Sequence, residues 1–111
     1  MDKDIGQFSG DGKDFGMNNQ LEEYRKEIDA LDIELIDALA RRIDVVRRVG
    51  ELKAQIDISV VQPKRAEAVK NRAVEMGAQK GLNEAFVRKV YDLMIDHAHE
   101  LEHEIMDAKS A

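Results

Sequence analysis

Apolar residues recur at alternating steps of three and four along the first half of the chain. We call this set the heptad stripe, and its members are Leu21, Tyr24, Ile28, Leu31, Leu35, Ala38, Val45, Val49, Leu52 and Ile56. Such spacing is typical of a helix that packs against another helix along its whole length. It predicts a single helix from about Asn19 to Asp57, roughly 55 to 60 Å long at about 1.5 Å per residue. Gly50 weakens this helix by about 1 kcal/mol relative to Ala, yet the pattern continues past it.

A helix of this length constrains the oligomeric state. A globule of about 95 residues has a radius of gyration near 13 Å, so the helix would project well beyond a compact monomer. We therefore expect a homodimer in which the long helices pair and the other segments wrap across them.

The rest of the chain predicts two shorter helices. Pro63 suits the first position of a helix that runs to about Gln79, and Asn83 suits the N-cap of a third helix from about Glu84 to Ala108. The apolar residues that share one face are Ala66, Val69, Ala73 and Met76 in the second helix, and Val87, Tyr91, Met94, Ala98, Leu101 and Ile105 in the third. The expected fold class is all-α, with three helices of unequal length per subunit.

Composition divides the chain once and excludes several functions. Residues 1–18 hold four of the seven glycines and few apolar residues, which predicts a flexible N-terminal tail before a helical domain over 19–111.

The net charge of −6 argues against a nucleic-acid partner, and no apolar run approaches the roughly 20 residues of a membrane span. With no cysteine, a disulfide framework and a thiolate metal site are excluded, and we expect a cytoplasmic protein.

One residue breaks the heptad stripe. Arg42 occupies the position between Ala38 and Val45 where an aliphatic side chain is expected. A buried charge needs an anionic partner, which is either an acidic side chain of another helix or a ligand; alternatively the side chain leaves the stripe for solvent. Lys53 lies on nearly the same face about 16 Å further along, so the two cations together could bracket a small dianion. Arg25 lies about 25 Å from Arg42 on the same helix, and could reach only a partner's site.

Other charged residues offer weaker signals. Arg65 adds a cation to the second helix, and Glu102 neighbours the apolar face of the third, where it is either part of a site or a solvated flanking residue. His97, His99 and His103 surround Glu102 and include an i, i+4 pair, but an exposed polar face is the better interpretation and we predict no metal. Arg41, Arg47 and Arg48 fall mostly off the stripe. Without a phosphate-binding glycine loop, a nucleophile with its base or a dinucleotide motif, an enzyme of this sequence would work by placing charges.

Three segments together resemble the all-helical class of chorismate mutases. They are LEEYRKEIDALDIELIDALARRIDVVRRVGELK, VVQPKR and GLNEAFVRKVYDLMIDHAHELE, and the similarity covers roughly residues 20–106. The resemblance implies an intertwined dimer with two equivalent sites. It also implies that Arg42, Lys53 and Arg65 bind substrate within one subunit, that the partner donates Arg25, and that Glu102 contacts the ether oxygen of the substrate. Gln62 falls near the expected position of the ring hydroxyl.

The chemistry implied by this resemblance needs no cofactor. Chorismate rearranges in one pericyclic step, in which a C–O bond breaks and a C–C bond forms. The enzyme holds the enolpyruvyl arm over the ring and stabilises negative charge that develops on the ether oxygen. Arg25 and Arg42 would bind the two substrate carboxylates, and Lys53 would contact a carboxylate and the ether oxygen. Glu102 can donate a hydrogen bond to that oxygen only when it is protonated.

Two departures from the family bear on the substrate. Ala66 replaces a glutamate that reads the hydroxyl at ring position 4, and Ala98 replaces a frequent serine. The segment from Val61 to Arg65, with Glu102, is similar to 4-amino-4-deoxychorismate mutases, which act in antibiotic precursor pathways. Isochorismate pyruvate lyases share the scaffold but usually carry glutamine at the Glu102 position. We favour a mutase over a lyase and the amino substrate over chorismate.

The alternative to an enzyme is a non-catalytic helical dimer or a regulatory module. It predicts that the cations form internal salt bridges and leave no cavity between them. A mutase predicts a small pocket where Arg42, Lys53, Arg65 and a partner's Arg25 converge.

Overall fold

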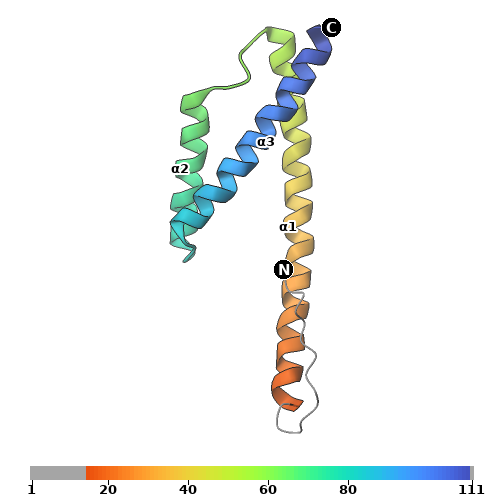
Figure 1. Ribbon diagram of the computed structural model, residues 1–111, viewed down its shortest axis with the longest axis vertical. Helices are drawn as coiled ribbons and strands as arrows, with labels where there is room; N and C mark the ends of the chain where they lie inside the picture. The colour runs from red at the N-terminus through yellow and green to blue at the C-terminus, as the bar shows by residue number, and fades with distance from the viewer. Residues whose placement is uncertain (1–14, 111) are drawn as a thin grey trace. The chain divides into compact units, whose positions relative to one another are not determined.

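The computed structural model describes residues 15–110 (Figure 1). These residues form three α-helices and no strand: α1 Phe15–Ile56, α2 Pro63–Gln79 and α3 Glu84–Ser110. The predicted all-α fold with three helices is therefore confirmed. The chain comprises two compact units, an N-terminal unit (Met1–Ala40) and a C-terminal unit (Arg41–Ala111), and α1 contributes to both.

The start of α1 differs from the expectation. The helix begins at Phe15 rather than near Asn19, so the last residues of the expected tail are helical. Residues 1–14, which make up the rest of that tail, lie outside the described residues.

The end of α1 is set by a backbone motif. Asp57 adopts a left-handed conformation with φ of 58°, and the backbone N–H of Ile58 donates to the carbonyl of Lys53 at 3.0 Å. This bond across five positions closes the last turn in the manner of a Schellman motif. The chain then leaves the helix in the short segment 57–62.

Local signals place α2 and α3 where the sequence predicts them. Pro63 is the first residue of α2, which ends at Gln79 as expected. Gly81, with φ of 80°, closes that end, because the N–H of Leu82 donates to the carbonyl of Gly77 at 2.9 Å. The Asn83 side chain caps α3 by accepting a hydrogen bond from the N–H of Phe86 at 2.8 Å.

The core of the C-terminal unit lies mainly between α2 and α3, which lie against each other near the turn that joins them and diverge further from it (Figure 1). Its buried apolar residues among those described are Val60, Val69, Ala73, Val87, Ile95 and Ala98. Ion pairs at 2.8 Å between Lys70 and Asp92, and at 3.2 Å between Arg88 and Glu67, join the two helices. The hydrogen bond from Lys70 to Asp92 raises the pKa of the lysine above its ordinary value.

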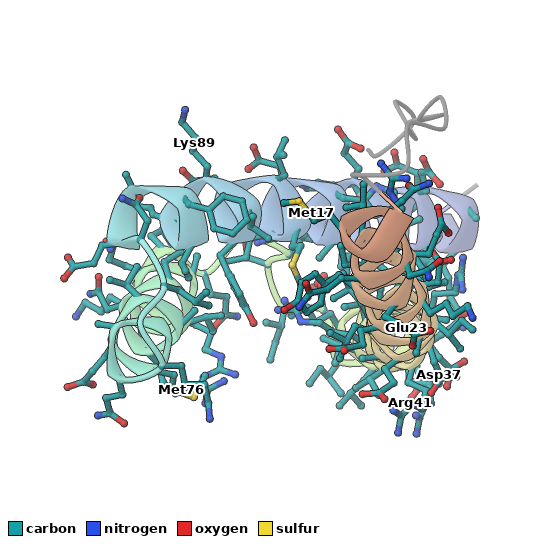
Figure 2. All side chains as sticks on the ribbon, turned by 90° about the horizontal axis from the view of Figure 1, so that it is seen from below. Met17, Glu23, Asp37, Arg41, Met76 and Lys89 are labelled. Carbon is teal, nitrogen blue, oxygen red and sulfur yellow. The ribbon has the colours of Figure 1, made fainter. Side chains whose placement is uncertain are left out.

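Met76 differs from Val69 and Ala73 of the apolar face of α2, which are buried. Met76 is 46% exposed, and its side chain points away from α3 (Figure 2). Gly77 is buried in its place, and a methyl group there would lie 2.9 Å from Cγ2 of Val87. Val69, Ala73 and Gly77 form the buried face of α2, and position 76 lies off that face.

Most of the heptad stripe is exposed in the single chain. In the N-terminal unit, Leu31 is 60% and Leu35 is 58% exposed, and Tyr24 and Ile28 are also exposed. In the C-terminal unit, Val45, Leu52 and Ile56 are exposed as well. Exposed apolar side chains gathered on one helix face in this way mark an interaction surface. None of the three helices described over residues 15–110 contains an apolar stretch of membrane-spanning length.

Candidate active site

A cavity of about 380 Å³ lies within the C-terminal unit. Every helix and the segment between α1 and α2 contribute to its wall. The lining residues are Arg42, Val46, Val49, Leu52, Lys53 and Ile56 of α1, Ile58, Val60 and Gln62 of the connecting segment, Arg65, Ala66 and Val69 of α2, and Ile95, Ala98, His99 and Glu102 of α3. Its volume suits a small molecule, and its wall is mostly apolar with a few charged groups.

A largely buried ion pair between α1 and α3 forms part of the cavity wall. Nζ of Lys53 donates to Oε1 of Glu102 at 2.8 Å, and also to the backbone carbonyl of Val60 at 2.8 Å. Glu102 is only 5% exposed, so of the two alternatives left open for it, that of a solvated flanking glutamate is wrong. Oε2 of the same carboxylate makes no hydrogen bond with another described residue.

The two arginines of the cavity have no acidic partner within residues 15–110. Arg42 is half-buried, and its guanidinium carbon lies 5.8 Å from the centre of the Tyr91 ring, a distance at which cation and ring attract. Arg65 is exposed at the start of α2. Arg42 therefore does not form the ion pair with an acidic side chain of another helix that was one of its alternatives, at least with any described residue. Both guanidinium groups keep hydrogen-bond donors for a ligand.

Three uncharged predicted residues also line the cavity. Gln62 precedes α2, and its amide Nε2 donates to the carbonyl of Ser59 at 3.3 Å. Ala66 and Ala98 contribute methyl groups from α2 and α3. The two alanines leave room where longer side chains would fill the space.

Arg25 belongs to the N-terminal unit. Its Nη1 lies 3.3 Å from Oε2 of Glu22, one turn earlier in the same helix. Of the eight predicted site residues, the structure brings the other seven together around the cavity. Their roles toward a ligand stay predictions.

His99 is a cavity residue that the sequence interpretation missed. It is half-buried, whereas His97 and His103 are exposed as expected. Its position next to Ala98 and one turn before Glu102 is the signal that could have identified it, because i and i+3 positions share a helix face. Within the described part of the chain, no group of three or more His, Cys, Asp or Glu side chains is placed to hold a metal ion.

The charged groups that line the cavity are of the kind that binds small anions. Three cations and one carboxylate line it, which leaves a net charge of +2 when Glu102 is ionised and His99 is neutral. The lining residues include no serine, threonine or cysteine nucleophile. Its polar groups are suited to hold carboxylates and to stabilise charge that develops within a bound molecule.

Comparison with known proteins identifies relatives that act on small molecules of the chorismate type. Residues 24–103 match the family model described as chorismate mutase type II. The chain is 37% identical to a 4-amino-4-deoxychorismate mutase of Streptomyces venezuelae over 83% of its own length and 89% of the relative. It is 36% identical to one of Streptomyces pristinaespiralis over 76% of its length and 65% of that protein. An isochorismate pyruvate lyase of Pseudomonas aeruginosa is 28% identical over 68% of this chain and 73% of the lyase.

Proposed function

The chain belongs to the chorismate mutase type II family, and we propose that it is an isomerase that rearranges 4-amino-4-deoxychorismate or chorismate. The products would be 4-amino-4-deoxyprephenate or prephenate. The observation that carries the proposal is the cavity lined by Arg42, Lys53, Arg65 and Glu102, in which two guanidinium groups lack an acidic partner within residues 15–110. A substrate with two carboxylates supplies the anions that these groups lack.

The reaction needs positioning and electrostatics rather than covalent catalysis. In this proposal the arginines hold the substrate carboxylates, so that the enolpyruvyl arm stays over the ring as the C–O bond breaks and the C–C bond forms. The apolar wall excludes water, which strengthens each charge interaction inside the cavity. Lys53 then stabilises the negative charge that develops on the ether oxygen.

Glu102 is proposed as the second group at the ether oxygen. Lys53 holds its Oε1, which orients the carboxyl group and leaves Oε2 toward the ligand. A protonated Oε2 donates a hydrogen bond to the ether oxygen, and this bond strengthens as negative charge builds up there. An ionised Glu102 would instead repel that charge, so this role requires the protonated form.

The 4-amino compound is the preferred substrate in this proposal. At Ala66 the cavity wall has a methyl group instead of a carboxylate that would select a ring hydroxyl. The two Streptomyces relatives support the same preference through their names and their greater similarity to this chain than the lyase shows. A lyase that releases pyruvate from isochorismate is the second candidate.

We also propose that the active form is a homodimer. The exposed part of the heptad stripe, including Leu31 and Leu35, gives each α1 an apolar surface that a second copy would cover. Arg25 is then proposed to reach the partner's cavity and to complete the binding of the substrate carboxylates. A cytoplasmic location, expected from the absence of cysteine, remains part of this proposal.

A parallel turnover assay tests the function. The purified protein is incubated with 4-amino-4-deoxychorismate, chorismate and isochorismate, and chromatography separates rearranged products from released pyruvate. We expect rearranged product, with the highest kcat/KM for the 4-amino compound. Pyruvate from isochorismate as the main product would favour the lyase, and no turnover of any compound would favour a non-catalytic module.

A further inference from the structure

Gly50 of α1 is buried, and it lies against Glu102 and Ile105 of α3. A methyl group at this position would lie 3.1 Å from Cδ1 of Ile105, 3.2 Å from Cα of Glu102 and 3.3 Å from Cγ of Glu102. All three distances are shorter than an ordinary contact between carbon atoms, which is about 3.5 to 4.0 Å. One of the three atoms belongs to the α3 backbone, which cannot move aside as a side chain does.

The same part of α1 holds the carboxylate of Glu102. Lys53 follows Gly50 by three positions, so the two residues share a helix face. The backbone of Glu102 packs against Gly50, and the Lys53 ammonium donates a hydrogen bond to Oε1 of Glu102 at 2.8 Å. Lys53 is itself held by the carbonyl of Val60, so it cannot follow Glu102 without losing that bond. A wider separation of the two helices would therefore draw the carboxylate away from the ammonium.

We propose that Gly50 is a positioning residue for Glu102. Its missing side chain sets the distance between α1 and α3 at which the Glu102 carboxyl group meets Lys53 and the cavity. Glycine is unfavourable inside a helix, so its presence here is explained by what a side chain would displace. The catalytic part of this inference rests on the proposed mutase activity.

The test compares Gly50→Ala with Gly77→Ala. Both glycines are buried in helices, and a methyl group at Gly77 would lie 2.9 Å from Cγ2 of Val87, but Gly77 does not line the cavity. We expect Gly50→Ala to lower kcat by about tenfold or more with KM changed by less than about threefold. Gly77→Ala should lower the unfolding midpoint and leave kcat within about twofold of wild type.

A double-mutant cycle separates positioning from general damage. In a Glu102→Ala background, Gly50→Ala should cause no further loss of kcat, because the group that it displaces is gone. Unchanged kcat in Gly50→Ala, or an equal loss in both backgrounds, would overturn the inference. If Gly50→Ala does not fold, the variant Gly50→Ala/Ile105→Val removes the shortest contact and is compared with Ile105→Val.

The position of the Glu102 carboxyl group can also be followed without measuring turnover. This separates the test of the positioning inference from the test of the proposed function. The carboxyl carbon of Glu102 is assigned by ¹³C NMR through the loss of its signal in Glu102→Gln. We expect this signal to shift in Gly50→Ala and to stay in place in Gly77→Ala. If the Glu102 signal shifts in Gly50→Ala but the wild type turns over none of the three compounds, the mutase proposal is refuted and the positioning inference stands. If the Glu102 signal does not shift in Gly50→Ala, the positioning inference is refuted.

Discussion

The ammonium of Lys53 lies 2.8 Å from Oε1 of Glu102, a residue 49 positions further along the chain. The same ammonium donates to the carbonyl of Val60, so one lysine joins the end of α1, the segment before α2 and the middle of α3. The pair is largely buried at the cavity wall, so it joins α1 to α3 and fixes the position of the carboxyl group at that wall. We propose that it contributes both to the stability of the C-terminal unit and to ligand binding. These two functions can be separated by mutation.

Replacing Arg42 by Ala should impair the reaction without unfolding the protein. Loss of a carboxylate contact by its guanidinium group is expected to cost about 3 kcal/mol of transition-state stabilisation, or more than about a hundredfold in kcat/KM. Steady-state kinetics measures the change. Arg48→Ala is the control, because Arg48 is exposed and pairs with Asp44 on the same helix. Equal activity of the two variants would show that Arg42 does not bind substrate.

Glu102→Gln should remain active. A glutamine accepts from Lys53 through its amide oxygen and donates from its NH₂ group, so it keeps both the bond to Lys53 and a donor for the ether oxygen. Glu102→Ala has neither group and should lose about a hundredfold or more in kcat relative to Glu102→Gln. Steady-state kinetics of the two variants and the wild type checks this expectation. A glutamine variant as inactive as Glu102→Ala would remove Glu102 from the proposed role.

Lys53→Met should destabilise the fold as well as abolish activity. It leaves the buried carboxylate of Glu102 without its cation, which costs about 2 to 4 kcal/mol for a partly buried pair. Urea unfolding followed by circular dichroism gives the free energy of unfolding. The double variant Lys53→Met/Glu102→Leu removes both charges and should recover most of the stability while it stays inactive. Failure to recover would mean that the hydrogen bond from Lys53 to Val60 dominates.

Charges placed on the heptad stripe should dissociate the proposed dimer. Glutamates at Leu31 and Leu35 would be buried against a second copy, which should weaken the dimer by roughly 3 kcal/mol or a factor of more than about 100 in dissociation constant. Sedimentation velocity measures the oligomeric state. Lys26→Glu, a charge change at an exposed position opposite the stripe, should leave the dimer intact. A wild-type protein that sediments as a monomer would refute the proposed dimer.

Neighbouring residues in the sequence determine the helices of this protein. Pro63 begins α2, Gly81 allows the turn that ends it, and Asn83 caps α3. Each of these effects acts over a few positions of the backbone, so it can be predicted without knowing what the helix packs against. The same holds for Arg42, whose charge interrupts a regular apolar pattern and therefore stands out in the sequence alone.

Contacts between distant segments decide the rest. The pairing of Lys53 with Glu102 and the entry of His99 into the cavity wall both depend on how closely the helices approach each other. That distance is set at Gly50 and Gly77, where the absence of a side chain lets backbones meet. Periodicity records which face of a helix is apolar, but it carries no information about the separation of two helices. The orientation of the carboxyl group at the cavity is therefore a property of the tertiary structure.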